Sequence, residues 1–267
     1  MKAKTILFIC LILLFSGCAK LQRAIGIAST KDYYSTLDRH DQKDYVDHLK
    51  YLGREYLRSR EKGEVVKISK DGQEYLRSIF RRLLNNNEIL LAKFRERKKQ
   101  PEFFIIRSET PFYFSVPDAK FFFSSGLIRK YIKNEEMLVS VMAFETVKSV
   151  RHIYEKQILI PIGHMGTDRI LATTRIPLQT KMEVHKWAYY IMKRSGYDAS
   201  AYLNWLQTQN KNTVDFILQV GDTRIMSREE FLFKNFIVSQ GGFEDRPQNI
   251  SNSSKDFYKL QKELKTR

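Results

Sequence analysis

Apolar residues recur at helical spacing through the first third of the chain, separated by many charged residues. Within residues 43–60 they fall three or four positions apart, as on one face of an α-helix: Tyr45, Leu49, Leu52, Tyr56 and Leu57. Gly63 ends this pattern. A longer helical pattern covers residues 71–98, and the three asparagines at 85–87 mark the place where we expect an interruption.

Short runs of aromatic and β-branched residues follow Pro101. Three of them are bounded by charged or turn-forming residues and predict β-strands, at residues 103–106, 111–116 and 120–124. Gly126 then opens a predicted short helix. The alternation between helices and a compact group of strands already indicates a protein that combines both.

Residues 134–154 predict a central helix with apolar side chains facing inward. Asn134 suits its N-cap, and Glu135 and Glu136 suit the positive N-terminal end of the helix dipole. The later pattern predicts a loop at 158–176, helices at 181–194, 199–209 and 227–238, and a polar tail with a short charged helix from about Ser254. We therefore predict an α+β fold, mainly helical, with a small β-sheet beside the 134–154 helix.

The N-terminus has the pattern of an export signal. A basic start is followed by an apolar stretch too short to span a bilayer, and then by Phe15-Ser16-Gly17-Cys18. This order resembles the lipobox of bacterial lipoproteins, although Phe15 stands where leucine is usual. The resemblance implies a signal peptide at 1–17, a lipidated Cys18 and a tether at 18–42. An ordinary secretory signal with an incidental cysteine is the alternative.

Composition agrees with an exported, membrane-anchored domain. Cys10 and Cys18 are the only cysteines, so the mature chain has no pair available for a disulfide. The formal net charge is +16, which suits a surface near anionic lipid headgroups or simply a solvated basic surface. We expect no nucleic-acid partner. In bacteria that follow the enterobacterial sorting rule, Ala19 after the cysteine favours the outer membrane, facing the periplasm.

Residues 144–148, Phe-Glu-Thr-Val-Lys, occupy the predicted central helix with the spacing of a His-Glu-x-x-His zinc motif. In that motif both histidines leave one helix face and bind the same Zn²⁺, while the glutamate activates the metal-bound water. Phe144 cannot ligate a metal, and the Lys148 ammonium has no lone pair and repels a dication. Only the glutamate, Glu145, is retained.

The surrounding residues resemble the zinc metallopeptidases of the HtpX, CAAX prenyl protease and periplasmic quality-control protease type. Residues 111–128 fill the frame of that family's N-A-F-A-x-P-G-G-x-I-x-V-x-x-G-L-L strand region. The family's third zinc ligand begins an E-A-D placed thirteen residues before a G-Y-D. Here Gly196-Tyr197-Asp198 is present, and thirteen residues before Gly196 is Glu183.

This resemblance implies a degenerate zincin-like (gluzincin-type) peptidase domain at 43–240, followed by the tail at 241–267. Glu145 would hold the general-base position, while Phe144, Lys148 and Glu183 would hold degenerate metal positions. We expect no cofactor, although an active family member would carry zinc. His152, His164 or His185 could rebuild a metal site only if the fold brought them together.

Three functions remain open. The chain is a non-catalytic binding or scaffolding lipoprotein, an active zinc metalloendopeptidase with atypical ligands, or an unrelated structural envelope protein. For the first, residues 112–115, namely Phe112, Tyr113, Phe114 and Ser115, are predicted to form an exposed sheet edge where an extended polypeptide docks. The alternative is that Phe112 and Phe114 are core residues of a strand. We also predict that Lys148 replaces the metal by pairing with Glu183.

Overall fold

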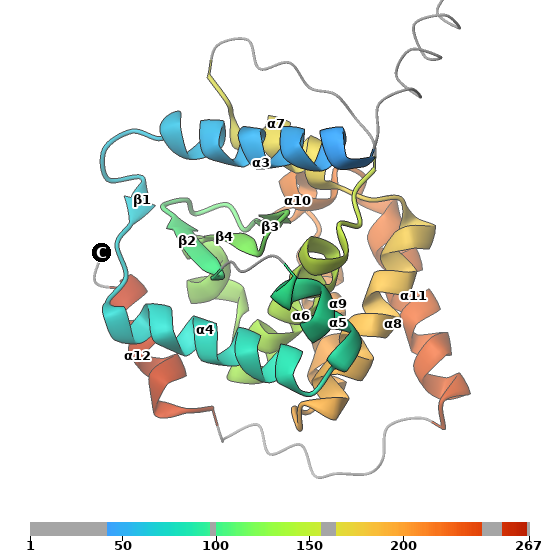
Figure 1. Cartoon of the computed structure of the whole chain (residues 1–267). Coiled ribbons are helices and arrows are strands. Elements are labelled where there is room, and N and C mark those ends of the chain that lie inside the picture. Colours follow the sequence, from blue (N-terminus) through green and yellow to red (C-terminus); the bar gives the residue numbers. More distant parts are fainter. Residues whose placement is uncertain (1–41, 97–99, 156–163, 242–252, 266–267) are drawn as a thin grey trace, which may run out of the picture. The chain divides into compact units, whose positions relative to one another are not determined.

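The computed structural model describes residues 42–96, 100–155, 164–241 and 253–265 (Figure 1). The predicted signal peptide, Cys18 and most of the tether therefore lie outside the described residues. Residues Val46–Arg267 form one compact unit. This unit continues beyond residue 240, where the sequence pattern placed the end of the domain.

The first helices follow the apolar pattern closely. They are α3 (Gln42–Arg58), α4 (Lys70–Asn85) and α5 (Glu88–Arg95). Ser69 caps α4, because its hydroxyl accepts a hydrogen bond from the Gly72 N–H at 3.1 Å. Buried Asn87 joins α4 to α5 by donating from Nδ2 to the Leu83 carbonyl at 2.6 Å. The predicted interruption at 85–87 is confirmed.

A mixed four-stranded sheet has the order β1-β2-β4-β3. Its strands are β1 (Val65–Val66), β2 (Glu102–Ile106), β3 (Tyr113–Val116) and β4 (Lys120–Ser124). β2 and β4 are parallel, whereas β1 pairs antiparallel with β2 and β3 pairs antiparallel with β4. All three predicted strands are present. β1 has only two residues, too few to produce a readable alternation.

Aromatic side chains cover both faces of β4, because successive residues of a strand point to opposite faces. Phe121 lies 5.5 Å, between ring centroids, from Phe80 of α4. Phe122 lies on the other face, 5.7 Å from Tyr56 of α3. Figure 1 shows α3 along one side of the sheet and α4 on the other. Burial on both faces explains the continuous apolar run in this strand.

Gly126 connects the sheet to the helices that follow it. A Cβ at this position would lie 2.4 Å from the Glu109 carbonyl oxygen, so only glycine fits. The π-helical turn η1 (Leu127–Tyr131) comes next, and then α6 (Glu135–Arg151). Asn134 caps α6 as predicted, accepting from the Met137 N–H at 2.9 Å. The helix ends three residues earlier than predicted, at Arg151 before a left-handed His152.

α6 is the central element of the fold, because every residue from Met137 to Val150 is buried. The remaining helices are α7 (Thr167–Thr174), α8 (Leu178–Arg194), α9 (Ser200–Lys211), α10 (Ile217–Val220), α11 (Arg224–Ser239) and α12 (Lys255–Lys265). α8 and α9 pack against α6, and α11 packs against both of them. The prediction of a loop throughout 158–176 was wrong, because α7 is helical.

The fold is thus α+β, mainly helical with a small mixed sheet, as the sequence predicted. Within the described ranges, no helix combines the length and the apolar character that a bilayer-crossing segment requires.

The last helix is part of the core, although the sequence around it is polar. Phe257, Leu260 and Leu264 of α12 are buried, and the helix packs against α4. Glu263 accepts hydrogen bonds from the Ser69 N–H at 2.7 Å and from its hydroxyl at 3.0 Å, at the N-terminus of α4. The predicted short helix in the tail is therefore an integral part of the domain.

We predict that Phe257→Ala lowers the free energy of unfolding by about 3–5 kcal/mol, because it removes a fully buried ring. The neighbouring Tyr258→Ala is the matched control. Tyr258 is half exposed, and its loss should cost about 1 kcal/mol or less. Urea denaturation followed by tryptophan fluorescence measures both. Equal effects of the two substitutions would show that α12 does not belong to the cooperative core.

Candidate functional site

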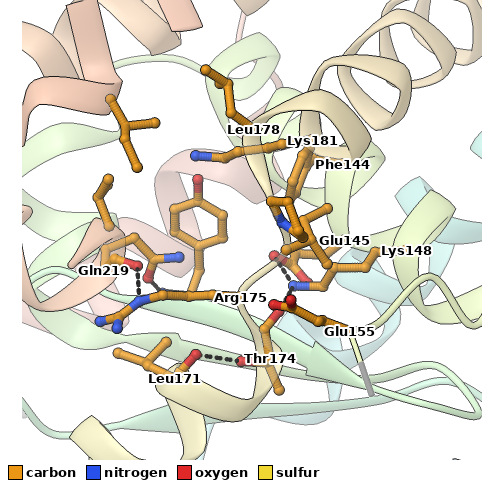
Figure 2. Close-up of a pocket in the computed structure, with 15 residues that line it drawn as sticks. Phe144, Glu145, Lys148, Glu155, Leu171, Thr174, Arg175, Leu178, Lys181 and Gln219 are labelled. Atoms are coloured by element: carbon orange, nitrogen blue, oxygen red, sulfur yellow. Dashed lines mark hydrogen bonds and ion pairs between the residues drawn. The ribbon is translucent and has the colours of Figure 1, made fainter. Parts of the chain in front are cut away.

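A pocket of about 190 Å³ opens where α6, β3, α7, α10 and the start of α8 meet (Figure 2). Its walls are largely apolar, with Leu171, Ile176, Leu178, Val220 and Ile225 among the lining residues. Five charged side chains also line it: Glu145, Lys148, Glu155, Arg175 and Lys181. The pocket therefore contains Glu145 and Lys148, two of the residues that the sequence analysis compared with a zinc motif.

Glu145 and Lys148 form a buried ion pair on α6. The Lys148 Nζ lies 2.8 Å from Glu145 Oε2 and 3.0 Å from Oε1. Lys148 is 3% exposed and Glu145 is 0% exposed. Ser115 of β3 donates to Glu145 Oε2 at 2.6 Å, and Lys148 donates to the Thr174 carbonyl at 3.4 Å. Burial lowers the pKa of Lys148, although the negative charge of Glu145 opposes this shift.

Phe144 packs against His185 of α8, with 4.8 Å between the ring centroids. The His185 Nδ1 lies 2.7 Å from the Tyr202 hydroxyl, and its Nε2 lies 2.6 Å from Glu229 Oε1. Lys181 donates to the other oxygen of Glu229 at 2.5 Å. A second buried network, centred on a carboxylate, thus lies behind the Phe144 ring.

Opposing effects set the protonation of this second network. Burial lowers the pKa of His185 and thereby favours the neutral ring, against the attraction of Glu229. For Glu229, burial raises the pKa, but the neighbouring Lys181 and His185 outweigh it and bring the pKa to about 2. Glu229 is therefore a carboxylate at neutral pH, neutralised by the Lys181 ammonium.

Glu183 does not reach the site. Its side chain is exposed and pairs with Lys186 at 2.7 Å on the same helix. The predicted pairing of Lys148 with Glu183 was therefore wrong. The reason is helical geometry: residues two apart point roughly 200° away from each other, so Glu183 faces solvent when His185 faces α6.

The donor set of this site does not fit a catalytic zinc ion, which needs about three protein ligands. Phe144 and Lys148 cannot ligate, Glu145 is paired with Lys148 and hydrogen-bonded to Ser115, and both His185 nitrogens have partners. His164 lies against Arg60, 2.9 Å from its guanidinium. Among the residues described, no cluster of three His, Cys, Asp or Glu is arranged to hold a metal.

β3 is an edge strand of the sheet, as predicted, but the edge is not exposed. Residues 112–115 are all buried. The Tyr113 N–H donates to Gln219 Oε1 at 2.8 Å, and the Tyr154 hydroxyl donates to the Ser115 carbonyl at 3.2 Å. The predicted exposure was wrong because side chains from α10 and from the segment after α6 cover this edge.

Sequence reasoning missed several residues of the site, including Tyr154, Tyr202, Gln219 and Glu229. One of them carried a readable signal. Glu229 lies on the buried side of α11 with Met226, Phe233 and Ile237, at helical spacing. A carboxylate on an apolar helix face is rarely left unpaired, and so it indicates a buried partner. Nothing in the sequence around Gln219 or Tyr154 indicates a role.

No protein-family model matches this chain, and a search of curated proteins finds no significant match.

We predict that Lys148→Met lowers the free energy of unfolding by about 3–5 kcal/mol, because it leaves Glu145 as an unpaired buried charge. Lys186→Met is the matched control, because Glu183 and Lys186 form a pair of the same spacing that is largely solvent-exposed. It should cost about 0–1 kcal/mol. Chemical denaturation measures both variants.

A second substitution separates charge from packing. Adding Glu145→Gln to Lys148→Met removes the unpaired charge, and it should recover part of the lost stability. If the double variant is no more stable than Lys148→Met, the penalty does not come from the stranded carboxylate.

Proposed function

We propose that this protein is a non-catalytic, metallopeptidase-like lipoprotein of the bacterial envelope that binds extended polypeptide. The observation that carries the proposal is the buried Glu145–Lys148 pair at the position of the zinc motif. It lies on α6 directly behind the edge strand β3, to which Ser115 connects it. α8, which would carry the third ligand of a zincin-like fold, packs on α6. The placement of β3 and α8 around α6 supports a resemblance to the zincin-like architecture.

The chemistry of Glu145 argues against catalysis. A general base must accept a proton from a water molecule within hydrogen-bond reach. Here Oε1 accepts from Lys148, and Oε2 accepts from Ser115 and lies 2.8 Å from the same ammonium. Since both oxygens are occupied and the side chain is fully buried, Glu145 stabilises the fold instead of activating water.

The position of the pocket beside the edge strand β3 supports polypeptide binding. An edge strand can bind an extended chain through main-chain hydrogen bonds, while a neighbouring pocket selects a side chain. The pocket lies beside Tyr113 of β3, and it combines apolar side chains with charged and polar ones. That combination is typical of binding sites that orient a ligand without reacting with it.

The proposal is tested with the full chain in detergent micelles and with reduced, carboxymethylated α-lactalbumin as an unfolded polypeptide. We expect saturable binding by fluorescence anisotropy, insensitivity of binding to EDTA, and no cleavage on prolonged incubation. An active zinc metalloendopeptidase would instead contain stoichiometric zinc and would cleave this polypeptide, and Glu145→Gln would abolish the cleavage. An unrelated structural protein would neither bind nor cleave it.

Attachment to the membrane is proposed to occur through Cys18, with the domain in the periplasm at the outer membrane. Acyl chains contribute about 0.8 kcal/mol per buried CH₂, and several chains hold a protein stably. We predict that Cys18→Ser moves the protein from the membrane fraction to the soluble fraction of broken cells. Unchanged membrane association of this variant would refute the anchor.

A further inference from the structure

We propose that α10 is a latch that closes the edge of β3, and that an extended polypeptide docks there only after Gln219 has left Tyr113. The inference rests on the proposed function, because it describes how the polypeptide-binding edge is regulated. It goes beyond that function by assigning a closed state to the edge and by naming the residues that maintain it.

The pairing of β3 with β4 determines which main-chain groups face the free edge. The Phe112 carbonyl accepts from the Ser124 N–H at 2.9 Å, so this residue directs its main chain toward β4. In an antiparallel pair the direction alternates from residue to residue. Tyr113 and Ser115 therefore direct their N–H and C=O groups outward. These are the groups that an added strand would bind.

Two side chains form hydrogen bonds with these outward groups, as the main chain of a bound peptide would. The carboxamide oxygen of Gln219 accepts from the Tyr113 N–H at 2.8 Å, in place of a peptide carbonyl. The Tyr154 hydroxyl donates to the Ser115 carbonyl at 3.2 Å, in place of a peptide N–H. An incoming strand needs the same donor and the same acceptor. It can therefore pair at Tyr113 once Gln219 has moved, and the pairing extends to the Ser115 carbonyl only if Tyr154 also moves.

α10 has fewer buried contacts than the strand β3 that it covers. It has four residues, none of them buried, and Ile217 is 54% exposed. Arg175 holds it through hydrogen bonds from Nε to the Gln219 carbonyl at 3.2 Å and from Nη2 to the Leu218 carbonyl at 2.5 Å. Val220 adds an apolar contact with the core. A segment with one partly buried side chain and a few polar contacts still opens at lower cost than the buried β3.

A buried aromatic ring precedes α10 and a glycine follows it. Before it, Phe216 is fully buried and packs 5.6 Å from Trp205 and 4.9 Å from Tyr131, between ring centroids. After it, Gly221 has a φ of +81°, and a Cβ there would lie 2.8 Å from the Arg175 guanidinium. The anchored ring and the glycine define the ends between which α10 can move. Figure 2 shows the Arg175 side chain running to Gln219 at the pocket wall.

The test compares Gln219→Ala with Gln219→Glu and Gln179→Ala in the full chain. Alanine removes the acceptor of the Tyr113 N–H, whereas glutamate keeps an oxygen at the same reach. Gln179 is exposed and does not line the pocket beside Tyr113. The readouts are amide hydrogen exchange at Tyr113 and the affinity for reduced, carboxymethylated α-lactalbumin. A net hydrogen bond of ordinary strength corresponds to roughly a two- to tenfold change in an equilibrium.

We expect Gln219→Ala to accelerate exchange of the Tyr113 amide and to tighten polypeptide binding about two- to tenfold. Saturating polypeptide should then protect this amide again. Gln219→Glu and Gln179→Ala should both behave as the wild-type protein does.

Three results would overturn the latch. They are unchanged Tyr113 exchange in Gln219→Ala, equal affinities of wild type and Gln219→Ala, and tighter binding that leaves Tyr113 unprotected. In each of these cases polypeptide binding by the wild-type protein can persist, so the proposed function survives. Absence of binding in every variant would instead remove the proposed function, and the latch with it.

Discussion

A buried ion pair on α6 connects this helix to both β3 and α7, and Ser149 adds a second link to β3 by donating to the Val116 carbonyl at 2.6 Å. Lys148 and Glu145 bond to each other, Ser115 of β3 bonds to Glu145, and Lys148 reaches the carbonyl of Thr174 in α7. Burying an ionised group costs several kcal/mol unless its partners are placed accurately. The pair is therefore tolerated only while the strand and both helices keep their positions, and this requirement fixes the geometry of the pocket.

The same ion pair also bears on how the edge of β3 is covered. A carboxylate whose oxygens are held by Lys148 and Ser115 cannot serve a metal-bound water, and it ties β3 to α6 from the inside. The outer side of the same strand is held by Gln219 and Tyr154. Covering an edge strand in this way prevents indiscriminate strand pairing. Access to β3 is then governed by how easily the cover moves.

The sequence predicted the regular elements better than the site. Three strands are short runs of apolar residues and the first helices have clear helical spacing, whereas β1, α7 and α10 have only two to eight residues each. The Glu145–Lys148 pair was readable, because residues three apart on a helix are neighbours. The position of Glu183 was predicted wrongly because the prediction relied on motif spacing. The helical period instead places His185 on the inner face of α8. The contacts of Gln219 and Tyr154 join distant segments and leave no local pattern.

Charge balance explains why the site needs two carboxylates. Lys148 and Lys181 both line the pocket. Burial lowers the pKa of Lys148 and that of His185, and the positive charge of Lys181 adds a smaller effect in the same direction. Like charges that line one pocket repel each other unless each has its own counter-charge. Glu145 neutralises Lys148 and Glu229 neutralises Lys181, through separate contacts. Since each lysine depends on its own carboxylate, Glu145 has a structural reason to be present that requires neither zinc nor catalysis.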